Sequence, residues 1–176
     1  MKDKRSSTVS LVLTALFAAV LAVCAWITVP AAVPITLQTF GVYAALLLLG
    51  GRRGTLSVAA YLLLGGLGAP VFAGFRGGPG VLFGATGGYL LGFLVIALLY
   101  WAVTARAGER LWVKALALVA GQLVAYVLGT LWFMTIYSWQ VEAVLAVCVL
   151  PFLLPDALKL LLALLVIPKL KKRIKF

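Results

Sequence analysis

The sequence predicts an all-α integral membrane protein, a single domain of six transmembrane helices over residues 1–176 with both chain termini in the cytoplasm. Hydrophobic residues make up 65% of the 176 residues and charged residues 11%, and the mean hydropathy is +1.18. A soluble domain of this size could not hide so much apolar surface from water, so lipid is the expected solvent. Each span needs roughly 20 apolar residues, which leaves room for about six spans and no soluble domain.

Lysine and arginine residues divide the chain into hairpins. Most of them fall into four clusters: Lys2, Lys4 and Arg5; Arg52 and Arg53; Arg106, Arg110 and Lys114; and Lys169, Lys171, Lys172, Arg173 and Lys175. Each interval between two clusters is long enough for two spans with a turn, and too long for one. Because cytoplasmic loops are enriched in Lys and Arg, all four clusters are expected in the cytoplasm, which requires an even number of spans.

Six apolar stretches are predicted as the helices, and they cover approximately residues 8–28, 37–50, 55–66, 85–105, 116–133 and 155–170. On the outer side they are joined by a proline-containing break at 29–36 and by the segment 68–84, which is too rich in glycine for a helix. Pro155 suits the first turn of the last helix. Two alternatives stay open for the apolar stretch 143–150, which either extends the last helix with a kink at Pro151 and Pro155 or forms a separate short helix.

Several function classes are disfavoured by the composition. The net charge of +11 comes from short clusters between apolar spans, so anionic lipid headgroups are the expected partner rather than nucleic acid. Cys24 and Cys148 lie in apolar runs without CxxC spacing, and the chain has no His, so no metal site and no cofactor are expected. The chain lacks a GxxxxGK[ST] motif for ATP and has few side chains suited to catalysis, so binding or transport is favoured over an enzyme.

Charged residues outside the basic clusters are the leading candidates for a ligand site. Asp156 and Lys159 lie three residues apart in the last predicted helix, which places both side chains on one face and within reach of one bound molecule. A charge inside the membrane costs roughly 2.5–3.5 kcal/mol, so such residues usually face a protein interior and mark function. The alternative is a self-neutralising pair near the helix end, with Lys159 reaching outward. Arg76, in the outer segment 68–84, is a further candidate, with water or phosphate headgroups as alternative partners.

Neutral polar residues and glycine add to the candidate site. Thr36, Gln38 and Thr39 lie in the outer turn before the second predicted helix, where they offer hydrogen bonds to an entering polar ligand or cap that helix. Gly74 belongs to a glycine-rich stretch that lets the backbone approach a ligand closely.

The first predicted helix carries two rows of small residues, Ala15 with Ala19 and Ala18 with Ala22. In lipid such rows allow close packing of helices, either within this chain or against a partner. Their spacing alone does not decide between the two.

Four motifs follow one another along nearly the whole chain. They are Val33-Pro-Ile-Thr-Leu-Gln-Thr-Phe-Gly41, Gly68-Ala-Pro-Val-Phe-Ala-Gly74 continuing through Gly77-Gly-Pro-Gly80, Gly84-Ala-Thr-Gly-Gly-Tyr89, and Pro155-Asp-Ala-Leu-Lys159. Together they resemble the BioY family, the biotin-specific substrate-binding subunits of energy-coupling-factor (ECF) transporters. The first and third motifs are fairly specific for that family.

The resemblance implies a subunit with the fold of ECF substrate-binding components that captures biotin at an outward-facing site in the prokaryotic plasma membrane. It also implies docking, through the alanine rows of the first helix, onto a transmembrane coupling protein of the EcfT type driven by two ATPase subunits. Two functions of other classes stay open. They are a self-sufficient, ion-coupled secondary transporter of a small carboxylate or vitamin, and a membrane enzyme that acts on lipid.

Biotin would need an acceptor, donors, a cation and apolar walls. Asp156 can accept a hydrogen bond from a ureido N–H, while Lys159 or Arg76 can meet the carbonyl or the carboxylate. Which of the two cations, Lys159 or Arg76, meets the ureido carbonyl and which meets the carboxylate of biotin stays open. The candidate apolar walls are Phe40, Phe72 and Tyr89.

Overall fold

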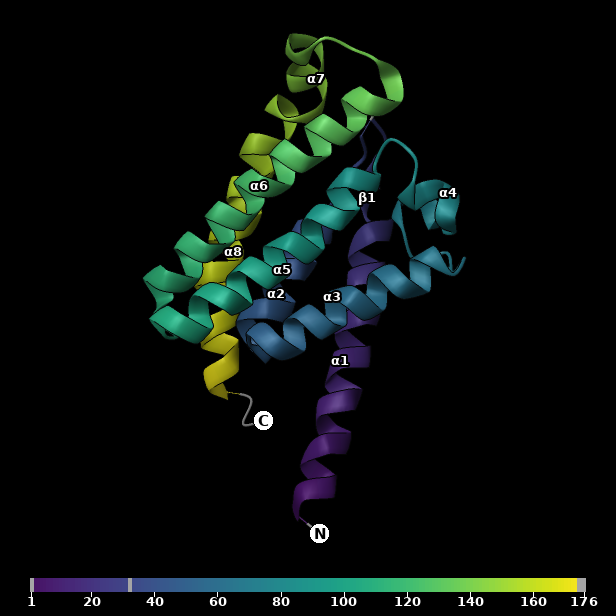
Figure 1. The fold of residues 1–176 in the computed structure, drawn as a ribbon. Coiled ribbons are helices and arrows are strands. Elements are labelled where there is room, and N and C mark those ends of the chain that lie inside the picture. Colours follow the sequence, from purple (N-terminus) through teal and green to yellow (C-terminus); the bar gives the residue numbers. More distant parts are fainter. Residues whose placement is uncertain (1, 32, 174–176) are drawn as a thin grey trace.

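Helices make up nearly all of the structure. A computed structural model describes residues 2–31 and 33–173, without the side chains of residues 2–7 and 172. The helices are α1 (Lys2–Trp26), α2 (Gln38–Leu49), α3 (Gly51–Gly66), α4 (Pro79–Leu82), α5 (Gly87–Ala107), α6 (Leu111–Tyr137), α7 (Val141–Cys148) and α8 (Leu150–Arg173). Two short strands, β1 (Thr28–Val29) and β2 (Ile35–Thr36), and one 3-10 turn, η1 (Ala73–Phe75), complete the fold. In Figure 1, α1 begins and α8 ends on the same, lower side of the molecule.

Within the described residues, four stretches of helix are long and apolar enough to cross a membrane, namely Thr8–Trp26, Gly87–Ala107, Leu111–Tyr137 and Val141–Lys171. With 12 and 16 residues, α2 and α3 are shorter than the roughly 20 residues of a full span. Other helices surround α2, so that all of its residues except Phe40 and Leu49 are buried. A helix covered in this way does not have to match the thickness of the lipid.

The break after α1 is a small β-hairpin. Thr28 pairs with Thr36 in it, so α1 ends at Trp26, earlier than the predicted range 8–28. The backbone N–H of Leu37 is shared between the carbonyl oxygens of Cys24, at 3.1 Å, and Ile27, at 3.2 Å. These bonds tie the start of α2 to the end of α1.

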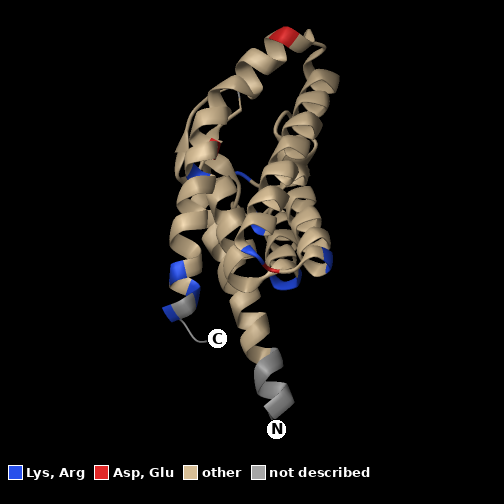
Figure 2. Ribbon diagram, turned by 90° about the vertical axis from the view of Figure 1, so that its left-hand side faces the viewer, with Lys and Arg blue, Asp and Glu red and all other residues tan. Residues whose placement is uncertain are grey.

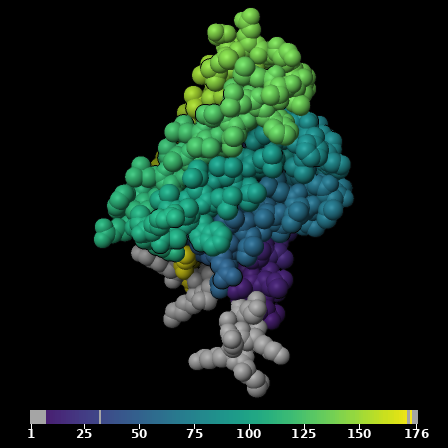
Figure 3. Space-filling model, in the orientation of Figure 1, coloured from purple at the N-terminus to yellow at the C-terminus, as the bar shows by residue number. Residues whose placement is uncertain are grey.

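Helices α5 and α6 form a closely packed antiparallel pair. Gly92 on α5 lies against Ala125, and Gly121 on α6 lies against Ile96, so closely that a side chain at either glycine would overlap its neighbour. Small residues at such crossings let two backbones approach in lipid. Figure 3 shows that atoms of α5, α6 and α7, in teal and green, cover the left and upper parts of this face of the molecule.

The two alanine rows of α1 face in different directions. Ala18 and Ala22 are only 4% and 5% exposed and belong to the main apolar core beneath α2 and α3. Ala15 and Ala19 are exposed. Neighbouring helices of this chain cover Ala18 and Ala22, which fits the alternative of packing within the chain for this row.

The glycine-rich segment between α3 and α5 contains η1 and α4, although no helix was expected there. Pro79 begins α4, where its missing N–H is harmless because a first-turn N–H has no partner inside the helix. Phe72 is 1% exposed and makes an edge-on contact with the ring of Tyr61, with 5.5 Å between the ring centroids. Its ring fills the space that the missing side chain of Gly65 leaves on α3.

The third hairpin departs most from the predicted ranges. α6 continues to Tyr137, and α7 is a separate helix, which decides between the two alternatives for 143–150. α8 begins at Leu150, so Pro151 and not Pro155 occupies the first turn. Pro155 lies inside the helix, where its ring removes one backbone hydrogen bond. Either proline could have begun the helix, and spacing alone could not distinguish them.

Basic residues gather at the end of the molecule where α1 begins and α8 ends, called the basic end below (Figure 2). Glu109, in the turn between α5 and α6, accepts a hydrogen bond from Lys114 at 3.0 Å. This hydrogen bond, with the charges of Lys114 and Lys171, holds the pKa of the Glu109 carboxyl below its usual value. The ion pair joins the α5–α6 turn to the start of α6.

Candidate ligand-binding site

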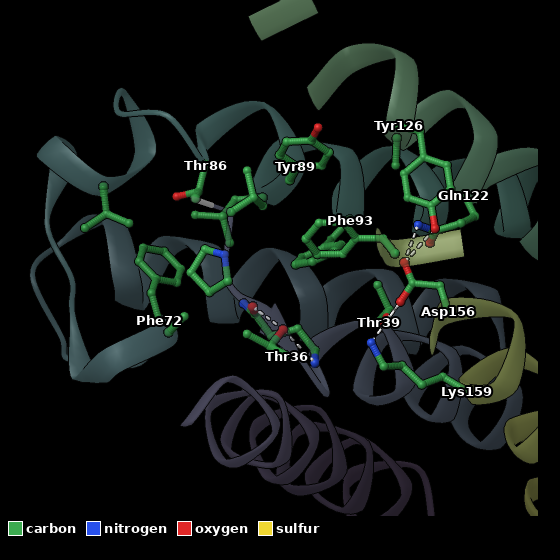
Figure 4. Close-up of a pocket in the computed structure, with 18 of the residues that line it drawn as sticks. Thr36, Thr39, Phe72, Thr86, Tyr89, Phe93, Gln122, Tyr126, Asp156 and Lys159 are labelled. Atoms are coloured by element: carbon green, nitrogen blue, oxygen red, sulfur yellow. Dashed lines mark hydrogen bonds and ion pairs between the residues drawn. The ribbon is translucent and has the colours of Figure 1, made fainter. Parts of the chain in front are cut away.

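A cavity lies between α2, α5, α6 and α8 (Figure 4). Its empty space is about 690 Å³, counted with its open mouth. The segment between α3 and α5 closes one side. The lining residues are Val33, Pro34, Thr36, Gln38, Thr39, Phe72, Ala73, Arg76, Val81, Thr86, Tyr89, Leu90, Phe93, Gln122, Ala125, Tyr126, Phe152, Asp156 and Lys159.

The carboxylate of Asp156 is the centre of one end of the cavity. Its Oδ1 accepts hydrogen bonds from Thr39 Oγ1 at 2.9 Å and Lys159 Nζ at 2.8 Å. Its Oδ2 accepts from Tyr126 OH at 2.8 Å and Gln122 Nε2 at 3.2 Å. Figure 4 shows these side chains converging on the carboxylate from α2, α6 and α8. Because Asp156 is only 4% exposed, these donors replace the water that would otherwise solvate its charge.

Lys159 cancels the charge of Asp156 within the same turn of α8. The two residues are buried and lie at i and i+3, and Phe152 adds an aromatic ring one turn earlier on the same face. An ammonium group carries three N–H donors, so Lys159 keeps donors for a further acceptor. This end of the cavity therefore offers both signs of charge with no net charge.

Tyr43 supports this arrangement from behind the cavity wall. It is completely buried and does not line the cavity. Its hydroxyl donates to Gln122 Oε1 at 2.6 Å. That bond orients the Gln122 amide so that its Nε2 faces Asp156.

A second polar group lies where the chain enters α2. Thr36 Oγ1 donates to Gln38 Oε1 at 2.8 Å, and Gln38 Nε2 donates to Tyr61 OH at 2.7 Å. Thr36 Oγ1 also accepts from the backbone N–H of Gln38 at 3.2 Å. Thr36 thus lines the cavity and satisfies an N–H at the start of α2, so the ligand-binding and helix-end alternatives for this residue are compatible.

Apolar side chains form the walls between these polar groups. Phe93 lies near the middle of the cavity, and Phe72 and Thr86 lie at the end away from Asp156 (Figure 4). Leu90 and Ala125 are also buried in the wall. A ligand with a polar head and an apolar body would match this division.

Arg76 lies at the mouth. It is exposed, and its Nε donates to the Ala73 carbonyl at 3.3 Å. Among the residues whose side chains the structure describes, it forms no ion pair with an acidic side chain. Its charge is therefore available to an anionic group at the entrance.

The structure brings most of the residues nominated from the sequence around one cavity: Asp156, Lys159, Arg76, Gln38, Thr36, Thr39, Phe72 and Tyr89. Phe40 and Gly74 do not line it. Phe40 packs against the main apolar core, on another face of α2. Gly74 lies in η1 with φ 69°, a left-handed conformation that glycine adopts readily, so it shapes the turn.

Among the lining residues that were not nominated from the sequence are Gln122, Tyr126 and Phe93. Gln122 and Tyr126 lie four residues apart on α6, and Thr130 continues the same row of polar residues. A row of polar side chains along one face of an apolar helix indicates a buried polar partner, so this signal was present in the sequence. Phe93 has no such signal, because one aromatic ring in an apolar helix resembles any core residue.

The described part of the chain contains no group of three or more His, Cys, Asp or Glu side chains that could hold a metal ion. The site offers hydrogen bonds, one neutral ion pair, one free cation and apolar walls. This chemistry suits reversible binding of a small molecule.

Comparison with known proteins gives consistent matches. The sequence model of the BioY family matches residues 1–176. A protein of Thermotoga maritima named biotin transporter BioY is 40% identical over 163 residues, which cover 92% of this chain and 95% of that protein. A probable biotin transporter BioY of Pyrococcus horikoshii is 40% identical over 161 residues, 90% of this chain and 94% of that protein.

A solved structure has a similar fold. It is the 2.1 Å crystal structure of the S-component for biotin from an ECF-type ABC transporter. It matches with a TM-score of 0.87 and 25% identity, over 98% of this chain and 95% of the other.

Removing one charge of the buried pair should destabilise the protein, and removing both charges should cost less than the two single losses added together. Lys159→Met leaves a buried carboxylate without its cation, and the expected loss of stability is about 3–5 kcal/mol. Asp156→Asn leaves a buried ammonium without its anion. The double variant should lose less than the sum of the single losses, because neither charge remains. Thermal unfolding in detergent measures these losses, with the exposed Lys169→Met as control, and strictly additive losses would contradict the coupling.

Proposed function

The chain belongs to the BioY family, and on that premise we propose that it is the substrate-binding subunit, or S component, of an ECF transporter and that it captures biotin. The observation that carries the proposal is the cavity that combines the neutral Asp156–Lys159 pair with apolar walls. Relatives covering most of the chain are named biotin transporters, and the similar solved structure is an S-component for biotin.

The chemistry of biotin matches the cavity. Biotin has a ureido group with two N–H donors and one carbonyl oxygen, a sulfur-containing ring, and a carboxylate at the end of an alkyl tail. The ureido oxygen can accept from the free N–H groups of Lys159, and a ureido N–H can take the place of one donor on Asp156. Phe93, Phe72 and Tyr89 would enclose the ring and the tail.

We place the carboxylate of biotin at Arg76. The Asp156–Lys159 pair is already neutral, so it suits the uncharged ureido head. Arg76 has no acidic partner within the described residues and lies at the mouth, where the carboxylate can keep part of its hydration. Thr36, Gln38 and Thr39 would contact the ligand between the two ends, while Phe40 and Gly74 support the site without touching the ligand.

Accumulation of biotin against a gradient requires energy, which we assign to partner subunits. The proposed partners are an EcfT-like transmembrane coupling protein and two ATPase subunits, so this chain binds and transfers biotin without being an enzyme. The exposed row of Ala15 and Ala19 on α1 is the proposed docking surface. Small residues permit the close helix contact on which association in lipid depends.

In the membrane we propose six spans within a single domain, with both termini in the cytoplasm. The four long apolar stretches support four of these spans. The short helices α2 and α3, each together with its adjoining turn, would provide the other two spans. Helix α2 needs no lipid contact because neighbouring helices bury it. The gathering of basic residues at one end supports a cytoplasmic position for that end.

Purified protein in detergent should bind biotin without ATP, as measured by titration calorimetry. Arg76→Gln should lower the affinity for biotin roughly tenfold or more, the usual effect of losing a hydrogen bond to a charged group. The same variant should leave the affinity for biotinamide, which lacks the carboxylate charge, nearly unchanged. Equal losses for both ligands would contradict the placement of the carboxylate. Binding of another vitamin with no binding of biotin would overturn the assignment of biotin as the substrate.

Substitution of Ala15 or Ala19 by Trp should abolish ATP-dependent uptake and leave biotin affinity nearly unchanged, because a bulky side chain prevents close docking. Uptake is measured in vesicles that contain the complete transporter. Ala120→Trp, at an exposed position of α6, is the matched control. Full uptake by the α1 variants would exclude this docking surface, and uptake without ATP would favour a secondary transporter.

Reporters fused at the C-terminus and inserted after Gly108 should report the cytoplasm, and a reporter inserted after Ser138 should report the outside. Gly108 follows α5 at the basic end, and Ser138 follows α6 at the opposite end. An outside signal from the C-terminal reporter would overturn the proposed orientation.

A further inference from the structure

Trp26, the last residue of α1, lies outside the cavity and holds the segment that closes it. Its indole Nε1 donates a hydrogen bond to the Pro70 carbonyl at 3.0 Å. Its ring stacks on Phe75 with 4.8 Å between centroids and 24° between the planes. Both contacts join the end of α1 to the stretch from Pro70 to Arg76, called the 70–76 turn below.

The 70–76 turn has one side toward the cavity and one toward Trp26. The backbone N–H of Phe72 donates to the Arg76 carbonyl at 2.9 Å, which closes the turn on itself. Phe72 and Arg76 line the cavity, whereas the ring of Phe75 is 63% exposed and meets Trp26. A movement of the turn would therefore displace a wall residue and the cation at the mouth together.

Phe75 has a backbone conformation that a bulky residue rarely adopts. Its φ is 57°, in the left-handed region, directly after Gly74 at φ 69°. Among the described residues, Ser138 is the only other non-glycine residue with positive φ. Such a conformation persists only when surrounding contacts hold it, and the stacked ring of Trp26 supplies that contact.

A tryptophan near a membrane surface often serves as an anchor among lipid headgroups. Here the indole N–H is already bonded to Pro70, and one face of the ring is covered by Phe75. With 37% of its surface exposed, Trp26 is covered mainly by its own chain. The geometry indicates a role in holding the turn in addition to contact with lipid.

We propose that Trp26 is a positioning residue that keeps the 70–76 turn closed over the ligand and thereby slows ligand release. The inference rests on the proposed function, because the ligand is taken to be biotin. A ligand that leaves through the mouth must wait for the turn to open, so its dissociation rate follows the population of the open turn. The association rate changes less, since the polar groups around Asp156 do not involve Trp26.

Three variants of the full chain separate the contribution of the stacked Trp26 ring from that of its hydrogen bond. Trp26→Ala removes the stacked ring and the hydrogen bond, Trp26→Phe keeps a ring and removes the hydrogen bond, and Trp112→Ala removes an exposed tryptophan at the basic end of α6. Biotin dissociation from detergent-purified protein should be roughly three- to tenfold faster for Trp26→Ala, the range expected for one lost aromatic pair. Trp26→Phe should give a smaller increase in the dissociation rate, and the Trp112→Ala control should dissociate at the rate of the unchanged protein.

Hydrogen exchange without ligand tests the turn directly. Amides of residues 71–78 should exchange faster in Trp26→Ala, with the amides around Asp156 unchanged. Unchanged exchange in 71–78 would overturn the role of Trp26 in holding the turn. Faster exchange with an unchanged dissociation rate would overturn the link to ligand release. Absence of biotin binding by the unsubstituted protein would instead overturn the proposed function, and the exchange result would still decide whether Trp26 holds the turn.

Discussion

A buried carboxylate must be surrounded by hydrogen-bond donors, and the arrangement of the cavity depends on meeting that requirement at Asp156. The donors come from Thr39 on α2, from Gln122 and Tyr126 on α6, and from Lys159 on α8. The same bonds that stabilise one charge therefore hold three helices at fixed distances from each other. A shift of any of these helices would leave part of the carboxylate without a partner, which is costly in a low-dielectric interior. The polar end is consequently the most constrained part of the site.

The cover of the cavity is held by contacts of another kind. Phe72 fits against Gly65 and Tyr61, and Phe75 stacks on Trp26. Phe72 is the only buried residue between α3 and α5. Segments with few buried contacts open more readily than a connected hydrogen-bond network. A rigid polar end beneath a more easily opened cover is a suitable arrangement for a protein that must admit a ligand, hold it and release it.

The sequence predicted the features that depend on spacing along one helix, and it failed where the outcome depends on which face meets a neighbour. Apolar length predicted a helical membrane protein, and the i, i+3 spacing predicted the pairing of Asp156 with Lys159. Both alanine rows of α1 obey the same spacing, so nothing local could show that α2 and α3 cover Ala18 and Ala22 and leave Ala15 and Ala19 outside. The polar row of Gln122, Tyr126 and Thr130 indicated that one face of α6 meets a polar partner, but nothing in the sequence showed that this partner is Asp156 on α8. Helix ends near prolines were also ambiguous, because Pro151 and Pro155 both suit a first turn.

The cancellation of charge between Asp156 and Lys159 has an electrical consequence. A membrane potential acts on net charge, with about 2.3 kcal/mol per elementary charge for each 100 mV that the charge crosses. The polar end contains two opposite charges joined at 2.8 Å, so the field exerts almost no net force on the empty site. An anionic group held by Arg76 at the mouth would cross little of the field, and an uncharged head that reaches Asp156 would carry no charge across it. Occupancy of such a site is nearly independent of voltage, so a cell can fill it equally well in energised and de-energised states.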